Sequence, residues 1–207
     1  MTPVAAGKRE RTKAHNRRAI VGAAQEIFTE MGYGAASIRD VVRRSGLAAG
    51  TFYNYFPDKQ SVFQAVLEEH TTELRRRLRE ARSRARDAET IVREGFMTYF
   101  SFIVEDRPLF EMLRRNAGTV RELFDTPALQ LGILELRDDL AAQGALPASL
   151  DLDALAAAMG GVAFELGIRL SEQEPPDVER TARFASELFL GGMARLAAVG
   201  GDDALET

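Results

Sequence analysis

The window from Ser37 to Lys59 constrains the fold of this chain most, because it predicts two short helices joined by a tight turn. Ser37 is a favourable N-cap, and Asp40 stands three residues later in a variant of the capping box. Gly46 ends the first helix and permits a sharp turn, and Pro57 stops the second. Apolar residues at i, i+3 and i+4 give the first helix one buried stripe and leave its arginines outside. The stripe consists of Ile38, Val41 and Val42, and the arginines are Arg39, Arg43 and Arg44.

The second helix of the window has one apolar face and one polar face. Phe52 and Phe56 lie at i and i+4 and share the face that must be buried, so Asn54 points away from the fold. An asparagine can pair with adenine N6 and N7 in the major groove, and Thr51 can contact a base edge or a thymine methyl. Gly50 leaves room for the backbone to approach a duplex. The pattern predicts a helix-turn-helix that binds DNA. The alternative is a helical hairpin that merely has a polar face.

A longer motif carries a resemblance to a known family. From Gly46 the chain reads G-L-A-A-G-T-F-Y-N-Y-F-P-D-K, and the preceding helix contains Ala23, Ala24, Ile27, Phe28 and Gly32. Over roughly the first 70 residues, the chain resembles the DNA-binding domain of the TetR family of bacterial transcription regulators. The resemblance implies a palindromic DNA operator, a small-molecule effector and a homodimer. The candidate DNA contacts are Arg18, Ser37, Arg39, Ala49, Gly50, Thr51, Tyr53, Asn54, Tyr55 and Lys59.

Two positions depart from the family pattern. Ala48 stands where the family usually has a serine that caps the second helix, and the loss of such a cap costs about 1 kcal/mol. Ala49 follows at a position that is often basic or polar. We therefore expect one phosphate contact to be missing at this helix start.

The charge of the chain is divided unevenly between its two halves. The net charge is −4, but residues 1–86 hold 17 Lys and Arg against 9 Asp and Glu, a net +8, and residues 87–207 have a net −12. A basic head on an acidic body favours approach to a polyanion through the head. The residues from Lys8 to Lys13 form a basic arm, which can follow phosphates or serve as a solvated tail. Arg17 or Arg18 is the better candidate contact, because a helix holds it in place.

Composition narrows the remaining possibilities. The chain has 207 residues and no cysteine, which excludes disulfides and thiolate metal sites. No hydrophobic run approaches the roughly 20 residues of a membrane span, and no secretory signal is evident. We therefore expect a cytoplasmic protein without membrane contact. His15 and His70 belong to no recognisable catalytic or metal motif, so we predict neither an enzyme nor a cofactor.

No useful strand alternation occurs, so the sequence predicts an all-α chain of about nine helices. We assign residues 1–59 to a basic arm and DNA-binding domain, and residues 60–207 to a ligand-binding and dimerisation domain. A connecting helix spans 58–86. The other expected helices cover approximately 14–31, 91–103, 109–113, 127–143, 152–170 and 177–199, with Gly144 as the stop after the fourth of these.

The helical body offers a candidate effector pocket with apolar walls and few polar groups. Its predicted lining is Phe96, Tyr99, Phe100, Phe110, Met112, Leu113, Asn116, Met159, Phe164 and Arg169. The alternative for most of these residues is ordinary core packing.

The last two helices are rich in small residues, which lets helices approach closely. This pattern fits either core packing or a dimer interface, and the family resemblance favours the interface. Its candidate residues are Ala156, Gly160, Ala163, Gly167, Phe184, Leu188, Gly191 and Gly192. Taken together, the sequence indicates a dimeric, ligand-responsive transcription regulator of the repressor type. The alternative function is a helical lipophile-binding protein with a vestigial DNA-binding head.

Overall fold

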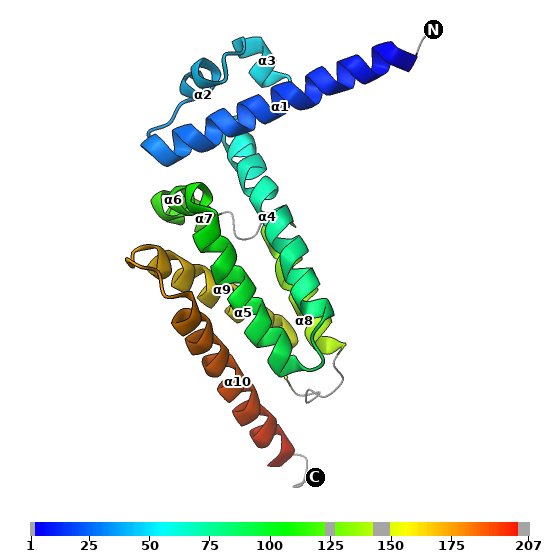
Figure 1. Ribbon diagram of the computed structural model, residues 1–207, viewed down its shortest axis with the longest axis vertical. Coiled ribbons are helices and arrows are strands. Elements are labelled where there is room, and N and C mark those ends of the chain that lie inside the picture. The colour runs from blue at the N-terminus through cyan, green and yellow to red at the C-terminus, as the bar shows by residue number, and fades with distance from the viewer. Residues whose placement is uncertain (1–2, 123–126, 143–149, 203–207) are drawn as a thin grey trace. The chain divides into compact units, whose positions relative to one another are not determined.

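The computed structural model describes residues 3–122, 127–142 and 150–202. These residues contain ten α-helices and no strand, which confirms the all-α prediction (Figure 1). The short helix α7 is the element that the sequence did not predict. The helices are α1 (Pro3–Met31), α2 (Ile38–Ser45), α3 (Ala49–Tyr53), α4 (Lys59–Ser83), α5 (Ala88–Glu105), α6 (Arg107–Arg115), α7 (Ala117–Glu122), α8 (Pro127–Ala141), α9 (Leu152–Ser171) and α10 (Val178–Asp202).

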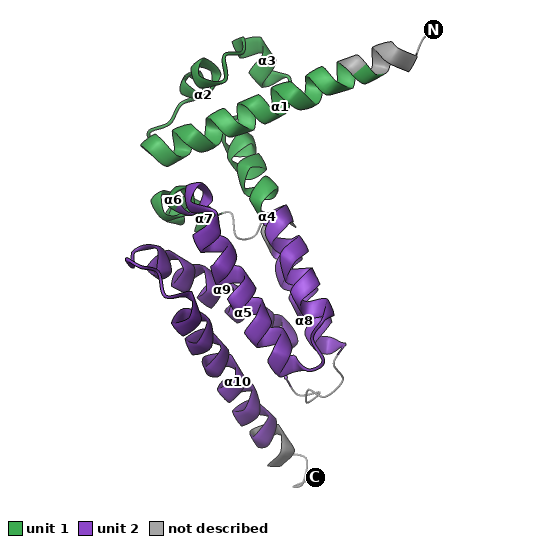
Figure 2. Ribbon diagram, in the orientation of Figure 1, with its two compact units in different colours: residues 1–70, 111–123 green, residues 71–110, 124–207 purple. Residues whose placement is uncertain are grey.

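The chain divides into two compact units, coloured separately in Figure 2. Unit 1 comprises residues 1–70 and 111–123, and unit 2 comprises residues 71–110 and 124–207. Helices α4 and α6 each pass from one unit into the other. The second segment of unit 1 is therefore about forty residues away in sequence from the first, and no local pattern indicates that it belongs there.

Helix α1 begins at Pro3, well before the expected start near Ala14. The expected arm from Lys8 to Lys13 is therefore helical. Its Ala, Lys, Arg and Glu residues are good helix formers, and proline is tolerated at a first helical position. The side chain of Lys8 lies outside the described residues.

The ends of α2 and the start of α4 form as the sequence predicts, whereas α3 ends at Tyr53 and not at the expected stop before Pro57. Ser37 caps α2: its hydroxyl accepts a hydrogen bond from the Asp40 N–H, and the Asp40 carboxylate accepts one from the Ser37 N–H at 3.1 Å. Hydrogen bonds from Ser37 lower the pKa of Asp40. Gly46 ends α2 with φ 69°, a left-handed conformation that glycine adopts easily. Asp58 caps α4 by accepting a hydrogen bond from the Ser61 N–H at 2.7 Å.

Unit 2 is a helical bundle in which α10 packs along α5, and α9 packs against α5, α8 and α10. Its core is built from apolar side chains of all four helices, among them Val92, Phe96, Phe100, Leu140, Met159, Leu170 and Met193. Two glycines allow α9 to approach its neighbours: a Cβ at Gly160 would lie 3.3 Å from Ile133, and one at Gly167 would lie 2.9 Å from Ile103. Helix α8 ends at Ala141, and the expected end at Gln143 and Gly144 lies outside the described residues.

Helix α9 departs from the expectation that no segment resembles a membrane span. By length and composition alone it could cross a membrane, with a mean hydropathy of 1.3 over its most apolar window. Its alanines raise this value although their side chains are small. Because α9 packs against three other helices of unit 2, we interpret it as a core helix.

Candidate nucleic-acid interface and interior site

Helix α3 has the orientation that the sequence predicts. Phe52 and Phe56 are 1% and 5% exposed, and their ring centroids lie 5.9 Å apart. Asn54 caps the C-terminal end of α3 and is exposed, as is Tyr53. The two phenyl rings therefore anchor a short helix whose polar side chains face away from the core of unit 1. This arrangement can present hydrogen-bonding groups to base edges.

The start of α3 is exposed but lacks a side-chain cap. Ala48 occupies the N-cap with φ −71° and ψ 148° and makes no capping hydrogen bond, as the sequence suggests. Ala49 and Gly50 follow and are exposed. The N–H groups of Thr51 and Phe52 already donate to the Ala48 carbonyl at 2.9 and 3.3 Å, so those of Ala49 and Gly50 are the ones left for a ligand or water.

We expect Ala48→Ser to stabilise the protein by about 1 kcal/mol, because the backbone at this position already has the conformation of a cap. The thermal midpoint should rise by roughly 2–4 °C, measured by circular dichroism. Ala35→Ser, at an exposed loop position, is the matched control and should leave the midpoint unchanged. An unchanged midpoint for Ala48→Ser would show that the uncapped start costs nothing.

The three arginines of α2, the helix before α3, differ in their ion pairs. Arg43 pairs with Asp40, and Arg44 bridges Glu26 and Glu30 at 2.7 Å each. Hydrogen bonding from Arg44 lowers the pKa of Glu30. Within the described residues Arg39 is exposed and has no ion pair, so its charge is available to a phosphate.

The two arginines of α1 also differ. Arg17 pairs with Glu69 at 3.0 Å and lies over the Phe56 ring, so it is held within unit 1. Arg18 is exposed and donates to the Ala14 carbonyl at 3.4 Å. Of these two candidate contacts, Arg17 has a carboxylate partner. Arg18 has none among the described residues, so its charge is not offset.

Lys59 has a structural partner that the sequence did not reveal. Its ammonium donates to the carbonyls of Tyr33 at 2.6 Å and Ala36 at 3.0 Å, and it lies over the Tyr33 ring. It therefore ties the start of α4 to the loop between α1 and α2. Two of its three N–H groups are engaged, which leaves one for the expected phosphate contact.

Asn116, predicted to bind a ligand, instead joins α6 and α7 to the end of α1 within unit 1. Its side chain accepts a hydrogen bond from the Tyr33 N–H at 2.5 Å and donates to the carbonyls of Phe28 and Met112. The residue is buried, and both of its amide hydrogens are used inside the protein. We therefore remove Asn116 from the candidate ligand set. Two of the three partners of Asn116, Tyr33 and Phe28, lie 83 and 88 residues away, so no local pattern could have shown this role.

The remaining predicted lining residues are distributed over both units. Phe96, Phe100 and Met159 belong to the core of unit 2, with Tyr99 packed against it. Phe110 and Phe164 are also buried in unit 2, whereas Met112 and Leu113 belong to unit 1. Arg169 is exposed. The set that the structure brings together is therefore the aromatic part of α5 with Met159 of α9.

Tyr99 differs from its apolar neighbours because it carries a polar group into the interior. It is half-buried, its ring meets Phe100 edge-on at 5.3 Å, and its hydroxyl has no hydrogen-bond partner among the described residues. Burial raises the pKa of Tyr99.

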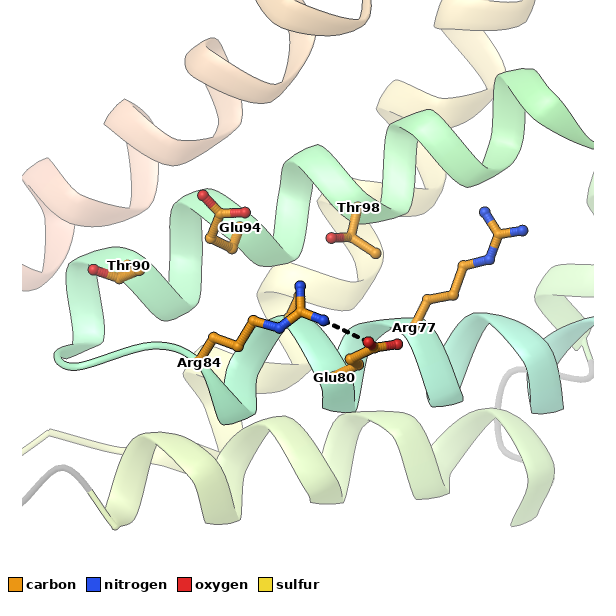
Figure 3. A pocket seen from close by; sticks show the side chains of 7 residues that line it. Arg77, Glu80, Arg84, Thr90, Glu94 and Thr98 are labelled. Atoms are coloured by element: carbon orange, nitrogen blue, oxygen red, sulfur yellow. Dashed lines mark hydrogen bonds and ion pairs between the residues drawn. The ribbon is translucent and has the colours of Figure 1, made fainter.

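A solvent-open groove of about 380 Å³ lies between α4 and α5 (Figure 3). Most of its wall charges are paired with neighbours, Arg84 with Glu80, and Arg77 with Glu73 and Glu105, whereas Glu94 has no ion pair within the described residues. Hydrogen bonds from Arg76 and Arg77 lower the pKa of Glu73 to about 2. The pairing leaves little uncompensated charge for a ligand, so we assign none to this groove.

The candidate dimer residues separate into buried and exposed positions. Ala156, Ala163 and Gly167 are buried in unit 2, so they serve packing within the chain. Phe184, Leu188 and nearby Leu196 on α10 are 58%, 51% and 56% exposed. Gly160 is half-buried against Ile133, and Gly191 and Gly192 are exposed. Of the candidate dimer residues, Phe184 and Leu188 of α10 are the ones that present a large exposed apolar side chain. In the described residues no group of acidic or histidine side chains could hold a metal ion.

Comparisons with known proteins agree with this geometry. Residues 20–66 match the family model described as bacterial regulatory proteins, tetR family. The fatty acid degradation regulator FadR from Bacillus halodurans is 22% identical, with a TM-score of 0.70 over 86% of this chain and 96% of that one. FadR from Bacillus subtilis, solved in complex with stearoyl-CoA, is 20% identical, with a TM-score of 0.70 over 84% and 98%. A TetR-family transcriptional regulator from Pectobacterium atrosepticum is 25% identical, with a TM-score of 0.58 over 88% and 96%.

Proposed function

Because this chain belongs to the TetR family of bacterial transcription regulators, which are DNA-binding transcription factors and not enzymes, we propose that it is a dimeric, effector-released repressor. It acts on a palindromic operator in the cytoplasm, and a small hydrophobic or amphipathic molecule releases it. The observation that carries the proposal is the orientation of α3, with Phe52 and Phe56 inside and Asn54 outside.

The exposed residues of α3 support sequence-specific binding. Asn54 and Tyr53 are exposed on the side away from the buried phenyl rings, with Gly50 at the helix start. Arg18 and Arg39 supply exposed positive charges for phosphates. These features argue against the alternative of a lipophile-binding protein with a vestigial head, because a vestigial head has no need to keep such groups uncovered.

A dimer is supported by the apolar surface of α10 and by the reach of one recognition helix. A single helix contacts only a few base pairs, whereas two helices about 34–36 Å apart can enter successive major grooves. Burial of an exposed leucine or phenylalanine stabilises an assembly by about 1.5–3 kcal/mol. Burial of Phe184, Leu188 and Leu196 would therefore favour association of two copies through α10.

We expect Leu188→Glu to convert the dimer into a monomer, because the substitution would bury an unpaired carboxylate in each copy. Sedimentation velocity should show the mass of one chain, and operator affinity should fall at least tenfold. Arg183→Glu on the same helix is exposed and lies well to one side of the apolar surface, so it should stay dimeric. A dimeric Leu188→Glu protein would place the interface elsewhere.

The nature of the effector is supported by the aromatic core of unit 2 and by one structural neighbour. FadR from Bacillus subtilis was solved with stearoyl-CoA, an amphipathic acyl thioester. Phe96, Phe100 and Met159 provide an apolar environment suited to an acyl chain. We therefore propose lipophilic acyl compounds as the effector class. The effector acts by binding more tightly to the conformation that does not fit the operator.

The direct test of the proposal is selection of bound fragments from the genome that encodes the chain. The expected result is a small set of fragments that share an inverted repeat and bind with nanomolar affinity. Affinity should decrease steeply with salt, as phosphate contacts require. Recovery of unrelated fragments with equal, weak affinity would instead support a lipophile-binding protein.

A further inference from the structure

The N-terminal part of α1 carries exposed positive charges. Residues 9–15 are all exposed, and the first buried side chain among the described residues of α1 is that of Ile20. Figure 2 shows α1 extending past the other helices of unit 1 at this end. Arg9, Arg11 and Lys13 are accompanied by one acidic residue, Glu10, and none of the three cations has an ion pair within the described residues.

We propose that one side of this segment lies along the phosphate backbone of the DNA next to the base pairs that α3 contacts. This side, the α1 cationic face, is defined by Arg11, His15 and Arg18. It extends the contact with DNA beyond the helix-turn-helix and is independent of base sequence. The inference rests on the proposed function, because it adds a second contact with the same duplex. The alternative is a solvated helix end.

Helical geometry separates two sides of the segment. At about 100° per residue, Arg11, His15 and Arg18 fall within about 60° of one another. Arg9 lies about 160° from Arg11, on the opposite side. Arg11 and Arg18 are about 10.5 Å apart along the helix axis, which is the axial length of about three phosphates of one DNA strand. Both guanidinium groups can therefore contact the same strand.

Ion pairs within unit 1 show where the neighbouring helices lie around α1. Arg17 pairs with Glu69 at 3.0 Å, so α4 lies on the side of Arg17. Arg44 of α2 pairs with Glu26 at 2.7 Å, so α2 lies on the side of Glu26. Arg11 is about 60° from Glu26 and about 120° from Arg17 around the helix. The α1 cationic face is therefore closer to the side of α2, whose start carries candidate DNA contacts, than to the side of α4.

Arg11 and Arg18 have similar side-chain arrangements. The Nε of Arg11 donates to the Gly7 carbonyl at 3.0 Å, and that of Arg18 donates to the Ala14 carbonyl at 3.4 Å. Each side chain thus runs back along α1 by one turn. The Nη groups of both remain without a hydrogen bond to the described residues. Guanidinium N–H groups bind phosphate oxygens strongly, so the two side chains are placed to do so along α1.

The charges of the segment disfavour its helix when no polyanion is near. Arg9 and Lys13 are four residues apart, and like charges at this spacing repel. Cations in the first turns of a helix also oppose its dipole. Because residues 9–15 are exposed, packing offsets little of this repulsion. Phosphates reduce it, so a duplex stabilises the helical extension that carries Arg11.

The test compares Arg11→Gln with Arg9→Gln, which removes the same charge from the opposite side of the same segment. Affinity of the full-length proteins for a random-sequence duplex is measured by fluorescence anisotropy at several salt concentrations. Each phosphate contact contributes about 0.9 to the slope of log K against log salt. We expect Arg11→Gln to reduce this slope by about 1–2 for a dimer and to weaken binding roughly 5- to 30-fold at physiological salt. Arg9→Gln should match the parent in both quantities.

A second measurement locates the segment on the operator recovered from the genome. The chain has no cysteine, so one introduced cysteine can carry an iron chelate that cleaves nearby DNA backbone. His15→Cys places the chelate in the middle of the α1 cationic face and should cleave the operator at one position in each half-site. Arg183→Cys, exposed on α10, is the control and should leave the operator intact.

The inference is overturned if Arg11→Gln keeps the salt dependence of the parent, if Arg9→Gln reduces it equally, or if labelled His15→Cys leaves the bound operator intact. Both arginines are exposed, so the thermal midpoints of the two glutamine variants should equal that of the parent. A parent that binds a palindromic operator but gives any of these results refutes the inference alone. A parent that selects no palindromic operator refutes the proposed function.

Discussion

Asn54→Ala is expected to lower operator affinity by about 1–3 kcal/mol for each half-site, roughly a 5- to 150-fold loss. The reason is that Asn54 is exposed on the face of α3 opposite Phe52 and Phe56, where its amide can form a bidentate pair with adenine. Binding to random duplex DNA should be nearly unaffected, because Asn54 adds no charge. Fluorescence anisotropy with both duplexes measures the two affinities.

Arg39→Ala is the matched control for Asn54→Ala. Arg39 is exposed and has no ion pair within the described residues, so we assign it to phosphate binding. Its loss should weaken operator and random DNA by similar factors and should reduce the salt dependence of binding. If Asn54→Ala binds both duplexes like the parent, the outward face of α3 does not contact bases.

The second large effect is expected from Asn116→Ala, which should lower the stability of the folded chain by about 2–4 kcal/mol. The substitution leaves the Tyr33 N–H without a partner, and it removes one of two hydrogen bonds to the Phe28 carbonyl, which still accepts from the Gly32 N–H at 3.1 Å. An unsatisfied buried group costs about 1–3 kcal/mol, and a further lost hydrogen bond costs about 1 kcal/mol. The thermal midpoint should fall by roughly 5–15 °C in a circular dichroism experiment.

Gly118→Ala provides the control for this loss, because Gly118 lies in the adjoining helix α7 and an added Cβ meets nothing within 4 Å. This variant should be as stable as the parent or slightly more stable. A midpoint for Asn116→Ala within 1–2 °C of the parent, about the effect of half a kilocalorie, would show that water replaces the lost hydrogen bonds.

The features that could be predicted from the sequence are those set by residues close together in the chain. Spacings of three or four residues determine the capping pair Ser37 and Asp40, the turn at Gly46, and the inward rings of Phe52 in α3 and Phe56 beyond its end. Helical periodicity likewise predicted nine of the ten helices. The sequence did not predict the early start of α1, because the expected basic arm and the first turns of the helix contain the same kinds of residue.

The features that could not be predicted depend on contacts between distant segments. Lys59 contacts carbonyls 23 and 26 residues away, and Asn116 reaches backbone groups 83 and 88 residues away. For the same reason, the sequence could not decide whether the small residues of α9 serve core packing or a dimer interface. Small size permits close approach, but only the fold shows that Gly167 faces Tyr99 and Ile103 of the same chain.

The central claim is that two copies of α3 enter successive major grooves of one operator. Dimethyl sulfate protection tests it most directly, since the reagent methylates guanine N7 in the major groove and adenine N3 in the minor groove. We predict protected guanines in two clusters about 10 base pairs apart, on one face of the duplex. Protection confined to adenine N3, or to a single cluster, would contradict the account.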